Sequence, residues 1–376
     1  MFQSYLFPIS YAFMAFPLAA LLFTLPFLIV QYRRHGYINK IRALILYLLL
    51  LYLLNAFFLV LLPMPDSRHN AAPTGHMLQP VPLQFIQDIL RNTHLSRNDP
   101  SSYLNVLRET DFLLAAFNVV LTLPFGLFLG YYFRTRWVVC IMLSFGLSLL
   151  FEITQITGIY GFFDHPYRIF DVDDLITNTF GGIAGFRIAL WISRLLPRIE
   201  QLDSQEDLSA KKVTYTRRGL ACLLDAVLWM SAALLLNQLS LNISFWAVSV
   251  VYFLIVPLFT GGRTLGKWVV RIRLGSADGG PLKLWMVWVR YGLLYGLLGG
   301  INFLSLDSAL MLNFGTASST VIRITAALAD LIFFIHLILR MFKRDRPLFY
   351  EEWSRTRNVI TWPDPQPAAA AETLAN

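Results

Sequence analysis

Long apolar stretches separated by short polar connections dominate this chain. Nine stretches stay apolar over about the 20 residues that an α-helix needs to cross a bilayer, so we expect each to be a transmembrane helix. They cover approximately residues 12–31, 43–62, 112–132, 137–157, 174–193, 219–237, 244–260, 285–304 and 321–341. The pattern therefore predicts an all-α fold, a polytopic membrane bundle of about nine transmembrane helices.

Lysine and arginine gather in every second connection between these stretches. The basic connections hold Arg33 and Arg34, Arg134 and Arg136, Arg194 and Lys211, Arg263 and Lys267, and Lys343 and Arg355. Short loops rich in these residues face the cytoplasm. We therefore expect the N-terminus outside, the C-terminus in the cytoplasm, and the long segment 63–111 outside. Within it, Leu83, Ile86, Ile89 and Leu90 share a helical face, which predicts an interfacial helix or an ordinary helix packed in a loop.

Acidic and amide side chains gather where the fourth and fifth apolar stretches meet. This cluster comprises Glu152, Gln155, Arg168, Asp171, Asp173, Asp174 and Asn178. Glu152 and Gln155 share one helix face, and Asp174 and Asn178 share a face of the next helix, so both pairs can look into one polar pocket. Asp171 and Asp173 can cap the second helix. Capping needs only one acid, however, and charge at membrane depth is costly and marks function.

The acid-rich stretch resembles the VanZ-like family of bacterial membrane proteins. The marks of that family are a helix with Glu and Gln, followed by an Arg-x-x-Asp-x-Asp-Asp-Leu-x-x-Asn-x-x-Gly run. Arg168, Asp171, Asp173, Asp174, Asn178 and Gly181 fall in register with this run. Asn118 ahead of Leu123-Pro124-Phe125-Gly126, and more loosely Gln79-Pro80-Val81-Pro82-Leu83, extend the resemblance over about residues 10 to 195. It implies a link to glycopeptide resistance of the teicoplanin type and adds Asn118 to the expected pocket.

A second charged set lies in the C-terminal apolar stretches. Arg218 stands at the mouth of its helix, Asp225 lies two turns further along the same face, and Asp330 lies near the middle of the last stretch. An intramembrane carboxylate costs about 2.5–3.5 kcal/mol on insertion, so both acids should face protein or water. The set could be a clamp that fixes helix packing, or part of a path for protons or cations.

These three residues resemble the pattern of the RDD family, which is named for one Arg and two Asp residues. The run Gly262-Arg263-Thr264-Leu265-Gly266-Lys267 resembles the Gly-x-Thr-Leu-Gly-Lys element of the same family. Residues 269–274 followed by Asp278-Gly279-Gly280 predict a short hairpin. Where the family has a His-Asp pair near its end, this chain has Tyr350-Glu351.

Composition agrees with a membrane protein, since 56% of the 376 residues are hydrophobic and 14% are charged. The net charge of +8 is spread over short loops without a basic patch, so we expect no nucleic-acid partner. The two cysteines, Cys140 and Cys222, lie in apolar stretches and are expected to be buried thiols. We expect a VanZ-like domain over 1–196, a cytoplasmic linker over 197–216, an RDD-like domain over 217–360 and a disordered tail over 361–376.

Three functions remain open for a protein that we expect in the bacterial cytoplasmic membrane. In the first, the outer pocket binds or shields an envelope lipid or a lipid-linked cell-wall precursor. In the second, the protein is a proton- or cation-coupled transporter that uses Asp225 and Asp330. In the third, a metal-assisted enzyme acts on a lipid phosphate, with the outer acids binding a divalent cation, whose oxygen ligands they match. No catalytic signature is present, and the sequence predicts no other cofactor and no oligomeric state.

Overall fold

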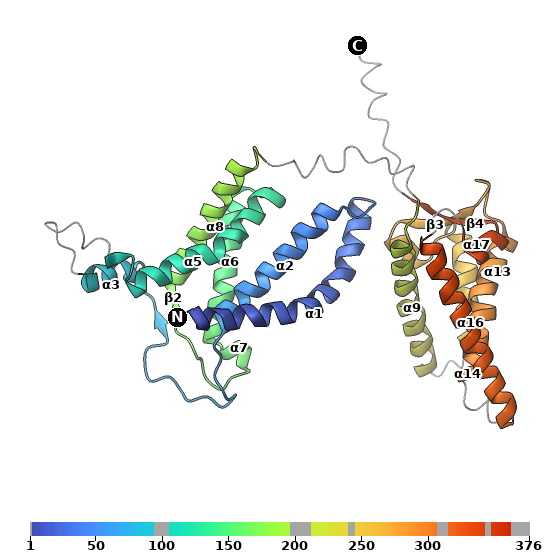
Figure 1. Ribbon diagram of the computed structural model, residues 1–376, viewed down its shortest axis with the longest axis horizontal. Helices are drawn as coiled ribbons and strands as arrows, with labels where there is room; N and C mark the ends of the chain where they lie inside the picture. The colour runs from blue at the N-terminus through green and yellow to red at the C-terminus, as the bar shows by residue number, and fades with distance from the viewer. Residues whose placement is uncertain are drawn as a thin grey trace, which may run out of the picture. The chain divides into compact units, whose positions relative to one another are not determined.

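A computed structural model describes residues 2–93, 105–195, 212–239, 245–306, 315–342 and 347–361. The chain forms two compact units, one made of residues 1–24 and 39–206 and the other of residues 25–38 and 207–376. Most of the expected linker, and the expected tail beyond residue 361, lie outside the described residues. The two units are described separately (Figure 1).

The first unit consists of helices with one short parallel strand pair. Its elements are α1 (Phe2–Arg34), α2 (Lys40–Leu61), β1 (Leu78–Gln79), α3 (Gln84–Thr93), α5 (Thr110–Leu127), the π-helical η1 (Phe128–Tyr132), α6 (Trp137–Ile156), α7 (Gly158–Gly161), β2 (Phe170–Asp171) and α8 (Val172–Ile192). Helix α1 is included whole, although its residues from 25 onward belong to the second unit. Strands β1 and β2 pair so that Leu78 lies opposite Phe170. The strand pair therefore joins the long segment after α2 to the start of α8.

Helix α8 packs closely on α5 and α6 (Figure 1), because its contact face is built from glycine. A methyl group at Gly181 or Gly185 would collide with the backbone of α5, at Val119 and Leu123 respectively. This close approach is what small residues at Gly-x-x-x-Gly spacing permit. Helix α2 joins the same group through the Tyr52 hydroxyl, which donates to the carbonyl of Leu121 at 2.8 Å.

The second unit combines helices with a two-stranded antiparallel sheet at one end (Figure 1). Its elements are α9 (Tyr215–Gln238), α10 (Phe245–Val250), the π-helical η3 (Val251–Ile255), α11 (Val256–Phe259), α12 (Leu265–Val269), β3 (Ile272–Ser276), α13 (Leu284–Tyr291), the π-helical η4 (Gly292–Leu298), α14 (Gly299–Leu306), α16 (Thr316–Phe342), α17 (Phe349–Trp353) and β4 (Thr356–Ile360). The buried Phe253, Leu274 and Tyr291 belong to one apolar core of this unit.

Eight helices of the described residues are long and apolar enough to cross a membrane. They confirm the prediction of an all-α polytopic membrane bundle. The stretch predicted over 244–260 is the exception, since its continuous apolar helical run, Ala247–Phe259, is shorter than a span. The helices predicted over 285–304 and 321–341 are present as Leu284–Ser305 and Thr316–Phe342. The orientation of the termini stays a prediction.

The hairpin predicted over 269–280 is wrong in its pairing. Strand β3 exists, but its partner is β4, with Ile272 opposite Ile360 and Ser276 opposite Thr356. The turn at Asp278-Gly279-Gly280 instead leads through Pro281 into α13. A turn signal in the sequence predicts a reversal of the chain, but it does not say which strand lies alongside.

Candidate functional site

Asp171 and Glu152 connect the end of α6 to the start of α8. Asp171 is the N-cap of α8, and its carboxylate accepts a hydrogen bond of 2.7 Å from the backbone N–H of Asp173. The backbone N–H of Asp171 in turn donates to the buried carboxylate of Glu152 at 3.0 Å. Burial raises the pKa of Asp171 above its ordinary value, and the hydrogen bond from Asp173 partly opposes this shift. The predicted capping role is thus confirmed for Asp171.

Asp173 holds the outer segment in place and does not cap its own helix. Its side chain, only 5% exposed, accepts hydrogen bonds from the backbone N–H groups of Leu83 at 2.5 Å and Phe85 at 2.9 Å. The Gln79 amide also donates to it at 3.4 Å. The loosely matched run 79–83 is therefore a structural part of the cluster. Helix α3 starts at Gln84, between the two residues whose backbone N–H groups contact Asp173. Its position at a bilayer surface stays a prediction.

Asn118 and Asn178 bring α5 and α6 into the same cluster. The Asn118 amide donates to the Asp174 carboxylate at 2.6 Å, and the Asn178 amide donates to the hydroxyl of Ser148 at 3.0 Å. Ser148 also donates to the carbonyl of Asp174 at 3.2 Å. The carbonyl oxygen of the Asn178 side chain is buried without a hydrogen-bond partner among the described residues.

Gln155 and Arg168 bind the end of α2 and the residue that follows it. Gln155 is buried, and its amide donates a hydrogen bond of 2.8 Å to the carbonyl of Val60. Its predicted partner Glu152 instead accepts from the backbone N–H of Asp171. Arg168 is exposed and donates to the carbonyl of Leu62 at 3.2 Å. Within the described part of the chain it forms no ion pair with the neighbouring acids. The accessible charged side chains of the outer cluster are therefore Arg168, Asp171 and Asp174.

The loops that surround this cluster are tied to each other as well. The His69 ring and the exposed Asp164 carboxylate lie 2.6 Å apart, and this hydrogen bond lowers the pKa of Asp164. Beside them, the amide of Asn70 donates to the carbonyl of His165 and accepts from its backbone N–H. These contacts were not predictable from the sequence, because their partners are 95 residues apart in the chain.

In the second predicted set, in the C-terminal unit, Asp225 is held by hydrogen bonds, as a clamp that fixes helix packing would be. Asp225 accepts three hydrogen bonds, from the hydroxyls of Tyr252 and Thr264 and from the backbone N–H of Gly266, at 2.6–2.7 Å. It therefore holds the start of α12 against α9. Arg218 forms an ion pair with a different carboxylate, that of Glu351, with a nitrogen–oxygen distance of 3.0 Å.

Glu351 is a buried carboxylate of this set that was not predicted from the sequence. Its side chain is 3% exposed and pairs with Arg218 at 3.0 Å and with Arg290 at 3.2 Å. The Asn358 amide also donates to it at 3.1 Å. The only signal in the sequence was its place in Tyr350-Glu351, where the resembled family has His-Asp. Burial also raises the pKa of the adjacent Tyr350 to about 12.

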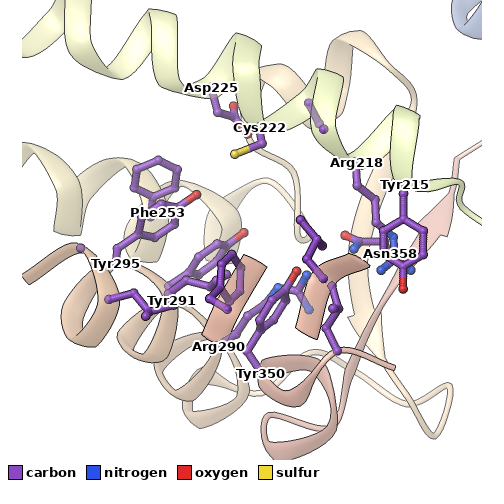
Figure 2. Close-up of a pocket in the computed structure, with 18 of the residues that line it drawn as sticks. Tyr215, Arg218, Cys222, Asp225, Phe253, Arg290, Tyr291, Tyr295, Tyr350 and Asn358 are labelled. Atoms are coloured by element: carbon purple, nitrogen blue, oxygen red, sulfur yellow. The ribbon is translucent and has the colours of Figure 1, made fainter. Parts of the chain in front are cut away.

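A cavity of about 560 Å³ brings the second set together (Figure 2). Arg218, Asp225 and Asp330 all line it, and Asp330 accepts a hydrogen bond of 2.8 Å from the amide of Asn302. Cys222 lines the same cavity and is exposed, so the expectation of two buried thiols is wrong for this residue and right for Cys140. An apolar sequence neighbourhood predicts helix and membrane depth, but not which helix face borders a cavity.

No metal site is formed by the described residues. Within their ranges, no three His, Cys, Asp or Glu side chains are grouped so that they could hold a metal ion. In the outer cluster, Asp171, Asp173 and Glu152 instead accept hydrogen bonds from backbone N–H groups. The geometry of the described residues thus gives no support to the metal-assisted enzyme.

A family model described as VanZ/LLP1 matches residues 47–194. This part of the chain is a VanZ-like domain. The match includes every residue of the outer cluster, from Asn118 to Asn178, together with the run 79–83 that Asp173 holds. The VanZ-like domain also contains four of the helices long enough to span a membrane, in whole or in large part, which makes the chain a multi-pass membrane protein. No curated protein and no solved structure matches the chain. The RDD-like character of the C-terminal unit stays a prediction.

Proposed function

We propose that the VanZ-like domain binds the head group of an envelope lipid, or of a lipid-linked cell-wall precursor, at the outer polar cluster. The observation that carries this proposal is the exposed Arg168 beside the half-buried acids Asp171 and Asp174. A guanidinium is a natural partner for phosphate or carboxylate. The two acids next to it suit an amine. The accessible side chains thus match a head group that carries both charges.

The arrangement of the cluster supports binding because it is held from several sides. Backbone N–H groups and the amide of Asn118 fix the acids, and the pairing of β1 with β2 fixes the segment that precedes them. A site whose polar groups are already oriented loses less conformational freedom when a ligand binds. Charged groups near membrane depth are expensive to keep, which is consistent with a functional role.

Native mass spectrometry of the detergent-purified full chain tests the proposal. We expect the wild-type protein to retain an envelope lipid or a polyprenyl-phosphate species, and we expect Arg168→Ala and Asp174→Asn to lose it. Removing one charge-assisted contact should weaken binding by about tenfold or more. Arg91→Ala is the matched control, since Arg91 lies in the same outer region with its side chain 75% exposed.

Equal retention of the lipid by the wild type, both variants and the control would contradict binding at the cluster.

The resemblance to VanZ extends the proposal to resistance against teicoplanin. Expression of the wild-type chain in a sensitive bacterium should then raise the inhibitory concentration of teicoplanin, and expression of Asp174→Asn should not. Comparable protein levels in the membrane fraction are the required control.

The geometry gives less support to the transporter that would use Asp225 and Asp330. All three contacts of Asp225 are donors, which satisfy both oxygen atoms of this carboxylate and tie it to Tyr252 and the start of α12. A carboxylate held in this way serves better as a clamp between α9 and α12 than as a carrier of protons. Asp330 has a single hydrogen bond, from Asn302, among the described contacts.

A further inference from the structure

The cavity of the C-terminal unit is long and has chemically different ends. It follows α13, η4 and α14 from Arg290 to Asn302, twelve residues or roughly 18 Å of helix at about 1.5 Å per residue. Its volume of about 560 Å³ falls among those of small-molecule sites, which span about 300–1,000 Å³. Figure 2 shows Arg218, Tyr215 and Asn358 on one side of this space and Phe253 and Tyr295 on the other.

One end of the cavity carries an excess of positive charge. Arg218 and Arg290 share the single carboxylate of Glu351, which leaves one positive charge without a matching negative one among these three groups. Arg290 is 5% exposed in its side chain, and a buried charge is costly unless it is paired. This end therefore suits an additional anion.

The same end also has hydrogen-bonding atoms to spare. Among the described residues, the Nε atoms of Arg218 and Arg290 and the Oδ1 atom of Asn358 are buried without a hydrogen-bond partner. Buried polar atoms of this kind are rare and call for an explanation. Arg218 and Arg290 both line the cavity, and a guanidinium group is a natural partner for the oxygen atoms of a carboxylate or a phosphate.

The middle of the cavity is apolar. Leu294, Leu298, Phe333 and Leu337 line it between the arginine end and the Asn302 end, together with the stacked rings of Phe253 and Tyr295. Burying hydrocarbon against such walls is favourable by about 25 cal/mol per Å². This part suits an alkyl chain.

The acids that line the cavity do not cancel the positive end. Both oxygen atoms of Asp225 are occupied by donors from α12 and from Tyr252. Asp330 lies with Asn302 at the far end, and the Lys267 ammonium donates to the hydroxyl of Tyr291. Asp330 is thus at the other end of the cavity from Arg290, and Asp225 already has donors of its own.

We propose that this cavity binds a hydrocarbon chain of an amphiphile whose anionic head, a carboxylate or a phosphate, lies at Arg218 and Arg290. The two sources of such chemistry are a free single-chain amphiphile and a membrane phospholipid with one of its chains inside. This site is separate from the outer cluster, since all of its residues belong to the C-terminal unit.

Binding of four probes with the same alkyl chain tests the proposal on the full chain in a neutral detergent. Dodecanoate, dodecyl phosphate, dodecanol and dodecyltrimethylammonium are added separately, and native mass spectrometry gives the fraction of protein that carries each. We expect both anionic probes to bind at least about tenfold more tightly than dodecanol, because they gain charge-assisted hydrogen bonds. The cationic probe should bind most weakly.

Two variants and two matched controls locate the binding. Arg218→Gln should remove the preference for anions, and Leu337→Trp should weaken all probes by filling the apolar part. Arg357→Gln and Phe334→Trp are the controls, because these residues neighbour Asn358 and Phe333 but are exposed and do not line the cavity. Both controls should bind as the wild type does.

The possible outcomes separate cleanly. Equal binding of dodecanol and the anions, tighter binding of the cation, or Leu337→Trp behaving as Phe334→Trp would each overturn the proposal. If dodecyl phosphate displaces a co-purified anionic phospholipid, the membrane lipid is the source. If dodecanoate binds and displaces no lipid, a free amphiphile is the source, and either result supports the site.

Discussion

Asp171 is the N-cap of α8 and also an accessible acid of the outer cluster. A cap needs only an acceptor, which Asn supplies as well as Asp does. Burial nevertheless raises the pKa of Asp171, so the charged form is held at a cost in stability. The retained charge therefore indicates a role beyond capping, and binding of an amine is the role that we propose.

Substitution of Asp171 separates capping from charge. Because the folded pKa lies above the ordinary value of 3.8, the stabilising contribution of this group is greatest at acid pH and decreases as pH rises from about 4 through the folded pKa. We expect Asp171→Asn to melt at an equal or higher temperature than the wild type at pH 7, with this decrease removed. Asp171→Ala should lose about 1 kcal/mol at either pH, because the cap is gone.

Thermal unfolding at pH 4.5 and pH 7 in the same detergent checks this expectation. If Asp171→Asn were as destabilised as Asp171→Ala at pH 7, the negative charge itself would stabilise the fold, and the argument for a charge kept for binding would be wrong.

Helix α8 illustrates what the sequence predicts at the scale of elements. Gly181 and Gly185 have the Gly-x-x-x-Gly spacing that permits close packing, and the structure places Gly185 against the carbonyl of Leu123 on α5. Gly185→Ala should therefore destabilise the protein by about 1–3 kcal/mol through overpacking. Gly146→Ala on α6 is the matched control, because a methyl group there meets nothing within 4 Å. We expect it to be neutral or slightly stabilising, since Ala favours helix.

Fluorescence-detected gel filtration after heating compares the two variants with the wild type. Similar melting of Gly185→Ala and Gly146→Ala would show that α8 and α5 do not approach as closely as described.

The helices were predictable from the sequence because hydropathy is a local property of some 20 consecutive residues. The pairing of the strands was not, because β1 pairs with β2, and β3 with β4, across long stretches of chain. The acids of the outer cluster were recognised from their spacing, but the partners of Asp173, which are backbone N–H groups near residue 84, carry no side-chain signal. Glu351 was not recognised for a different reason: both of its arginine partners are more than 60 residues away.

At the scale of the whole molecule, the proposed function depends on the outer cluster lying on the outside. The distribution of Lys and Arg predicts this orientation. In a chain with Cys140→Ser and Cys222→Ser, we expect Asp66→Cys to react with a membrane-impermeant maleimide on intact cells. Arg136→Cys should react only after permeabilisation. Both native residues are exposed and lie in connections on opposite sides of the expected bilayer.

The reverse labelling pattern would place the cluster in the cytoplasm and rule out a ligand on the outer face. It would leave the cavity of the C-terminal unit untouched as a binding site, because that inference rests on charge and shape and not on orientation.

The pairing of β3 with β4 also sets an order for biosynthesis. A chain is made from its N-terminus, so β3, Arg218 and Arg290 enter the membrane region before Glu351 and β4 have left the ribosome. Until then the two arginines lack their shared carboxylate and β3 has an open edge. Of the described elements, the last one synthesised is thus the one that closes the unit. A nascent chain interrupted before residue 351 would present these unpaired groups, which are what the quality-control proteases of a membrane can recognise.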